Sequence, residues 1–213
     1  MNKNLKSYDK DLRKSKELLK KSGFTWDRAG KLYDKTGNRV ELDMLTNAGN
    51  TEREAIGVMV KQDLEDLGMK VNFKPVEFNS LVNKLVNTLD WDAVIMGFTG
   101  SPLEPNGGKN VMMSDGTLHV YNMRLPKDKN STRLKFEKRI DELFIKGALV
   151  TDFKERKKYY DEYQKIIYDE KPFIYIYSPT RIVAIRNKFK NIFPTSLGGL
   201  IYNIEEIFIN GND

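Results

Sequence analysis

Helical and strand periodicities alternate through the first half of the chain, and this alternation constrains the fold more than any other feature. A segment with apolar residues at helical spacing is followed by a short apolar strand pattern, and the pair then recurs twice. Such alternation favours a mainly parallel or mixed sheet with helices on its faces, which is an α/β fold. We predict helices starting near residues 9, 51 and 78, and strands at 40–46, 70–76 and 93–96.

The helix boundaries follow from capping and stop signals. Gly23 and Gly68 come directly after helical patterns and are predicted to end them. Thr51 is predicted as the N-cap of the second helix, which precedes Glu52 and Glu54 in the first turn. The third helix is expected to run from Phe78 to Leu89. The inner stripes of the first two helices are predicted to be Leu12, Ser15, Leu18 and Leu19, and Ile56, Met59, Val60, Leu64 and Leu67.

The second half begins with two further helical patterns, at about 132–145 and 152–169. Pro172 ends the second pattern. The sequence PFIYIYS at 172–178 and the apolar run at 182–185 are both predicted as strands. For residues 202–209 the pattern does not decide between strand and helix.

A long loop follows the strand at 93–96. Residues 97–122 are rich in Gly, Ser, Pro, Asn and Asp, and long loops inside compact domains are most often functional or disordered. The aromatics, methionines and single histidine of this loop favour a functional loop over a disordered one. In parallel sheets ligands bind at the carboxyl ends of strands, where this loop and the 47–50 loop both begin. We therefore expect the loop to form one wall of a ligand site, with Phe98 and Tyr121 as aromatic surface.

Charge and cysteine content exclude several classes of function. The net charge is +6, but the lysines alternate with acids along the helices, which is typical of solvated faces rather than of a nucleic-acid stripe. The absence of Cys excludes disulfides and thiolate chemistry. No apolar run approaches the ~20 residues of a membrane helix, and the N-terminus lacks the apolar stretch of a signal peptide.

The residues offer little catalytic chemistry. His119 is the only histidine, and a lone loop histidine is more often a structural hydrogen-bonding residue than a catalytic one. Neither glycine-rich stretch matches a phosphate-binding loop, and no cofactor motif is present. One alternative is a small α/β hydrolase that pairs His119 with Glu104 or Asp115; another is a basic module that binds an acidic polymer.

Four stretches, in order, carry a family resemblance: YDKDLRKSKELLKKSGF, VELDMLT, TEREAIGVMVKQDLEDLGMKVNF and WDAVIMGFTGSPLEP. This co-linear set resembles the C-terminal part of extracytoplasmic solute-binding proteins of the oligopeptide, dipeptide and nickel ABC-importer family. ERKKYYDEYQKIIYDEKPFIYIYSPTRIVAIRNKFKN is similar to the later helix, proline break and strand pair of that family.

The resemblance implies a non-catalytic protein of the type II periplasmic-binding-protein fold. Residues 1–213 would form a single lobe of a larger two-lobed protein whose N-terminal part, with the signal or lipoprotein segment, is absent. That protein would bind an oligopeptide or similar solute between its lobes, as a monomer outside the cytoplasm, and deliver it to a membrane permease. Oligosaccharides and metal chelates are the alternative ligands.

The resemblance also points to the ligand loop. Peptide-binding members carry glycine, tryptophan, two small residues and an aspartate that holds the peptide amine. Here Gly97 and Phe98 are followed by Thr99 and Gly100, and Ser101 stands at the aspartate position, so that carboxylate is not carried over. Glu104 is a possible substitute. The predicted ligand-contact residues are Phe98, Thr99, Gly100, Ser101 and Glu104, with Asn47, Asn110 and His119 as further candidates.

Overall fold

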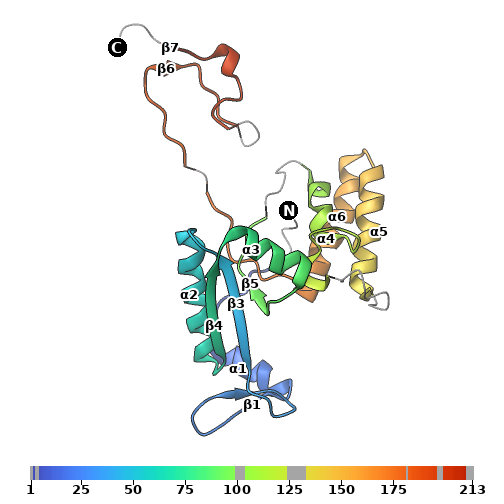
Figure 1. Cartoon of the computed structure of the whole chain (residues 1–213). Coiled ribbons are helices and arrows are strands. Elements are labelled where there is room, and N and C mark those ends of the chain that lie inside the picture. Colours follow the sequence, from blue (N-terminus) through green and yellow to red (C-terminus); the bar gives the residue numbers. More distant parts are fainter. Residues whose placement is uncertain are drawn as a thin grey trace.

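Three parallel strands form a sheet that lies between helices α2 (Thr51–Asp66) and α3 (Phe78–Asn83) (Figure 1). The computed structural model describes residues 2, 5–98, 104–123, 133–180, 182–195 and 199–209. The strands are β3 (Glu41–Asn47), β4 (Lys70–Val76) and β5 (Ala93–Val94), in the order β4-β3-β5. Both pairings are parallel, which confirms the predicted α/β fold class. β5 is shorter than the predicted strand at 93–96, because only Ala93 and Val94 are in register with residues of β3.

Strand β3 is buried on both faces at its carboxyl half. Met44 lies in register with Phe73 of β4, and Leu45 lies in register with Lys74 on the opposite face. Met44, Leu45 and Thr46 are all buried, so consecutive residues on both faces of the strand are covered. Central strands of parallel sheets are covered on both sides, so strict alternation understates their burial.

Helix α2 (Thr51–Asp66) covers the face of the sheet that carries Phe73. Gly57 lies against the Phe73 ring, and a Cβ at that position would overlap it. The N-cap is Asn50 rather than the predicted Thr51, because the Asn50 side chain accepts from the Arg53 backbone N–H at 2.9 Å. The predicted inner residue Met59 is exposed.

The next helical segment lies toward the other face of the sheet and is not one regular helix. Helix α3 (Phe78–Asn83) passes into a π-helical turn at Lys84–Thr88, and Leu89 ends it with φ of +54°. The predicted helix from 78 to 89 is therefore confirmed in extent as far as Thr88, but its C-terminal half is π-helical rather than α-helical. Leu81 and Leu85 are its buried residues.

Helix α1 (Leu12–Lys21) and the hairpin of β1 (Thr25–Trp26) with β2 (Leu32–Tyr33) lie at the end of the sheet where β3 and β4 begin (Figure 1). Gly23 has φ of +89°, as the predicted stop requires. Leu18, predicted as an inner residue, is about half exposed, and α1 has no buried residue. Helix α1 is therefore only partly packed against the rest of the described chain.

A second core lies among α4 (Lys109–Met112), α5 (Lys135–Leu149) and α6 (Phe153–Glu170). The two long helices confirm the predicted pair, with boundaries shifted by a few residues for α5. The core is formed by Met112, Ile140, Phe144, Tyr160 and Ile167. No helix among the described residues has the length and apolar character that crossing a membrane would need.

The predicted strands at 172–178 and 182–185 are wrong. In the described part of this region no residue belongs to a strand, and Ile174 and Ile182 are 89% and 90% exposed. A strand needs a neighbouring backbone to pair with, and the described residues 172–180 and 182–185 make no backbone-to-backbone hydrogen bond. Beyond it, β6 (Phe189–Lys190) pairs with β7 (Phe208–Ile209) in a unit that stands apart from both cores (Figure 1).

Candidate functional site

The carboxyl end of the sheet gathers polar groups from β3 and α2. Asn47 is the last residue of β3, and its side-chain oxygen accepts a hydrogen bond of 2.7 Å from Nη1 of Arg53. Nη2 of Arg53 lies beside Gly97, where a Cβ would be only 2.8 Å away. Arg53 is half-buried. The guanidinium therefore joins the two strand ends where the predicted ligand loops begin.

Phe98 stands at the edge of this group as an aromatic surface. Its side chain is 43% exposed, and its ring meets Phe173 edge-on with centroids 6.2 Å apart. Phe173 also contacts Tyr121 edge-on, at 5.0 Å. Phe98 therefore has the exposure expected of an aromatic wall. Thr99, Gly100 and Ser101 lie outside the described residues, so their predicted role stays a prediction.

Tyr121 packs against the core of the second group of helices rather than forming exposed surface. Its hydroxyl donates to the Met112 carbonyl at 3.0 Å. Burial, with the nearby Glu137 carboxylate, raises the pKa of Tyr121 above its usual range. The ring is thus fixed behind Phe173, where it supports the aromatic wall.

Glu104 is already engaged within the chain. One of its oxygens accepts from the Asn106 backbone N–H at 2.9 Å and caps the 3-10 turn Pro105–Gly108. The same oxygen is paired with the Arg156 guanidinium of α6. The Asn106 bond and the Arg156 charge together hold the pKa of Glu104 below its usual value. Any amine that used Glu104 would have to compete with Arg156.

Asn110 and His119 hold the loop together. Asn110 Oδ1 accepts from the N–H and the hydroxyl of Thr117, at 2.8 and 3.0 Å. His119 is only 3% exposed, and its Nδ1 and Nε2 lie 3.2 Å from the Val111 carbonyl and 3.1 Å from Glu137. These contacts favour the structural role for both residues.

The hydrolase alternative fails on geometry. In the described part of the chain the partner of His119 is Glu137, not Glu104 or Asp115, and Glu104 pairs with Arg156. A general base must be able to reach substrate, and a histidine enclosed by Val111 and Glu137 does not. The same described ranges contain no group of three or more His, Asp or Glu side chains that could hold a metal ion.

Sequence reasoning missed Arg53, Phe173 and Tyr177. Arg53 lies in the first turn of a helix that starts at the carboxyl end of a parallel strand, and that position was a usable signal. The Glu52 carboxylate, next to Arg53 in sequence, raises the pKa of the Tyr177 hydroxyl, which places Tyr177 near the start of α2. The pattern of 172–178 predicted a strand and gave no sign that Phe173 and Tyr177 reach the carboxyl end of the sheet.

A parallel α/β sheet with candidate ligand groups at its carboxyl edge defines the class of fold, which is that of the type II periplasmic-binding proteins. NikZ from Campylobacter jejuni, in complex with Ni(L-His), has a TM-score of 0.73 at 21% identity over 97% of this chain and 41% of its own. The oligopeptide-binding protein AppA from Bacillus subtilis, in complex with a nonapeptide, has a TM-score of 0.70 at 24% identity over 93% of this chain and 37% of its own.

Sequence comparison gives the particular family. Residues 1–117 match the middle region of the bacterial extracellular solute-binding proteins, family 5, and the chain belongs to that family. A probable ABC transporter-binding protein of Deinococcus radiodurans is 29% identical in an alignment 171 residues long that covers 77% of this chain and 29% of that protein. Bacillus subtilis AppA is 27% identical in an alignment 206 residues long that covers 91% of this chain and 34% of that protein. The chain thus spans about a third of the length of these relatives.

Proposed function

We propose that the chain is one lobe of the substrate-binding component of an ABC importer. The lobe would hold a small solute, an oligopeptide in the first instance, against a second lobe, and the closed complex would dock on a membrane permease. Hinge closure would follow from the greater affinity of the ligand for the closed state. Family membership, joined to the placement of Arg53, Asn47 and Phe98 at one sheet edge, carries this proposal.

The charge at this edge supports a ligand that bears a carboxylate. Arg53 offers a half-buried guanidinium, which suits bidentate recognition of a carboxylate group. Binding of a peptide's amino terminus has less support than binding of its carboxylate. Ser101 stands where an amine-binding aspartate would be expected, and Glu104 is paired with Arg156. Phe98 adds apolar contact area beside the guanidinium.

Oligosaccharides and metal chelates remain the alternative ligands. NikZ holds a nickel–histidine complex on the same fold. This chain has no Cys, and its single His119 is buried in the loop, so a chelate would have to bring its own metal ligands. The Arg53 guanidinium suits the carboxylate of such a chelate as well as that of a peptide.

The proposed second lobe accounts for an exposed segment of this one. Residues 174–180 and 182–185 carry exposed apolar side chains and, in these described ranges, make no backbone-to-backbone hydrogen bond. Exposed apolar segments of this kind are usually covered in stable proteins. Further polypeptide of a longer protein would pair with them. The longer protein would act outside the cytoplasm, free or as a surface lipoprotein, without catalysing a reaction.

The test is native mass spectrometry of the longer protein that this proposal requires, purified under non-denaturing conditions from its own host. The expected result is a co-purified peptide or other carboxylate-bearing solute at one per protein. A protein that carries no solute, and binds none from a peptide library, contradicts the proposal. A co-purified neutral glycan would contradict the proposed carboxylate-bearing ligand but would still agree with the proposed transport function.

A further inference from the structure

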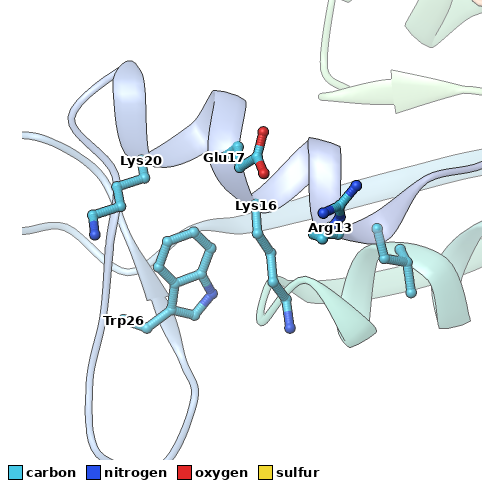
Figure 2. A pocket seen from close by; sticks show the side chains of 6 residues that line it. Arg13, Lys16, Glu17, Lys20 and Trp26 are labelled. Carbon is cyan, nitrogen blue, oxygen red and sulfur yellow. The ribbon is translucent and has the colours of Figure 1, made fainter.

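A hollow between α1 and the β1–β2 hairpin lies at the opposite end of the sheet from the candidate ligand site. It has a volume of about 460 Å³ and is lined by Leu12, Arg13, Lys16, Glu17, Lys20 and Trp26 (Figure 2). We call it the α1 groove. β3 and β4 begin near this groove and end at Asn47 and Val76, so an occupant here would not compete with a solute at Arg53.

The floor of the groove is a fixed aromatic surface. Nε1 of Trp26 donates to the Leu67 carbonyl at 2.7 Å, which ties the indole to the end of α2. Gly68 lies directly behind it, since a Cβ there would be 3.0 Å from the same nitrogen. Trp26 also lies in register with the fully buried Leu32 in the hairpin. A rigid indole is a good contact surface, because little side-chain entropy is lost on binding.

The rim of the groove is cationic. Arg13, Lys16 and Lys20 are spaced three and four residues apart, so they share one face of α1, with Lys16 and Lys20 extending along the indole in Figure 2. None of the three forms an ion pair within the described ranges of the chain. The single acid of the lining, Glu17, is paired with Lys14 at 3.5 Å. The groove thus offers three unpaired cations around one aromatic face.

Several basic residues elsewhere are paired with acids. Lys10, before α1, pairs with Asp63 at 2.5 Å, and Lys158 of α6 pairs with Glu155 at 2.5 Å. Nucleic acids are bound by extended tracks of unmatched cations. Three cations within two turns of one helix, around a hollow the size of one or two side chains, suit a more compact anionic group.

We propose that the α1 groove is a docking site for an acidic peptide segment of a partner protein. An apolar or aromatic side chain of that segment would lie against Trp26 and Leu12, and flanking carboxylates would contact Arg13, Lys16 and Lys20. The exposure of α1 agrees with this, because no residue of the helix is buried and Leu12 in the groove lining is only half-buried. The docking site does not depend on the proposed transport function.

The test uses the whole chain with Trp91→Phe, which leaves Trp26 as the only indole. The probe is a short synthetic peptide in which glutamates flank one phenylalanine. We expect a saturable blue shift of Trp26 emission, and binding weakened by about tenfold or more in Lys16→Glu/Lys20→Glu. Lys154→Glu/Lys158→Glu on α6, with the same spacing and charge change, should bind as the parent does.

Four outcomes overturn the proposal. The first is unchanged Trp26 emission at saturating peptide, and the second is equal loss of binding in the two double variants. The third is equal affinity for a peptide with glycine in place of phenylalanine, and the fourth is tighter binding of a single-stranded oligonucleotide. Either of the last two would reduce the groove to a charged surface. Far-UV circular dichroism of each variant separates loss of binding from loss of fold.

Discussion

Nε2 of His119 lies 3.1 Å from Oε1 of Glu137, inside the contact between the 104–123 segment and α5. Glu137 is fully buried, and its oxygens also accept from Asn122 Nδ2 and from the Leu134 backbone N–H, both at 2.6 Å. One carboxylate therefore holds the end of the loop and the start of the helix together. Buried carboxylates are tolerated only with such partners.

Replacing this carboxylate should unfold the helical core at lower denaturant concentration. Glu137→Ala leaves the His119 ring and the Asn122 amide without their acceptor, and breaking a buried pair of this kind costs about 3 kcal/mol. Urea unfolding followed by circular dichroism measures the loss. Glu142→Gln is the matched control on the same helix, where the carboxyl is exposed, and should change the free energy of unfolding by less than about 0.5 kcal/mol. Equal effects would contradict the assigned role of Glu137.

The same residue should contribute to the loss of stability in acid. Burial acts to raise the pKa of Glu137, but hydrogen bonds from Asn122, His119 and Leu134 outweigh it and lower the pKa below the value of 4.5 for an unperturbed Glu. Because the folded-state pKa is the lower one, the stabilisation is complete above pH 4.5 and is lost as pH falls through the folded-state value.

Glu137→Gln removes this titration. The free energy of unfolding of the variant should therefore fall less steeply below pH 4.5 than that of the parent, whose slope from one such group is at most about 1.4 kcal/mol per pH unit. Urea unfolding at a series of pH values gives both slopes. Parallel curves for variant and parent would exclude the proposed contribution.

Gly57→Ala tests the packing of α2 on the sheet. Helix propensity alone predicts that alanine stabilises by about 1 kcal/mol. A Cβ at position 57 would overlap the Phe73 ring, so we expect a net destabilisation of about 1–3 kcal/mol instead. Ala55→Gly, at an exposed position of the same helix, should cost about 1 kcal/mol by propensity. Stabilisation by Gly57→Ala in urea unfolding would show that the helix does not pack as described.

Amide hydrogen exchange tests whether further polypeptide covers the exposed segment. In this chain alone, amides of 174–180 and 182–185 should exchange at near-unprotected rates, while the paired amides of β3 are protected. In the longer protein the same segment should become protected, because its backbone then has strand partners. Fast exchange in both proteins would contradict the two-lobe proposal.

Local patterns predicted the elements whose partners are near in sequence. β4 was predicted at its observed bounds, 70–76, and both long helices of the second core were found, because amphipathic spacing and proline or glycine stops act within a few residues. The 172–178 strand failed because a strand exists only with a neighbour. The left-handed conformation of Leu89 was not predicted, because no local signal marks a left-handed leucine.

The location of the candidate site could be predicted from the sequence, but the contacts of its side chains could not. The carboxyl ends of the strands and Phe98 followed from topology and from the Gly97–Phe98 pair. The engagement of Glu104 by Arg156 joins residues 52 apart, and that of His119 by Glu137 joins residues 18 apart. Such contacts depend on how the loop lies against α5 and α6. Helical and strand periodicity carries no information about them.

Solute occupancy of the longer protein, in parent and Arg53→Ala forms, tests the central claim most directly. Both would be purified without denaturation and the retained solute quantified by mass spectrometry, with Arg28→Ala in the exposed hairpin loop as control. The proposed function predicts a carboxylate-bearing solute in parent and control, and an occupancy reduced by about tenfold or more in Arg53→Ala, since a lost charged contact of about 1.5–3 kcal/mol has that effect. Equal occupancy in all three proteins, or no solute in any, would contradict a ligand site at this edge of the sheet.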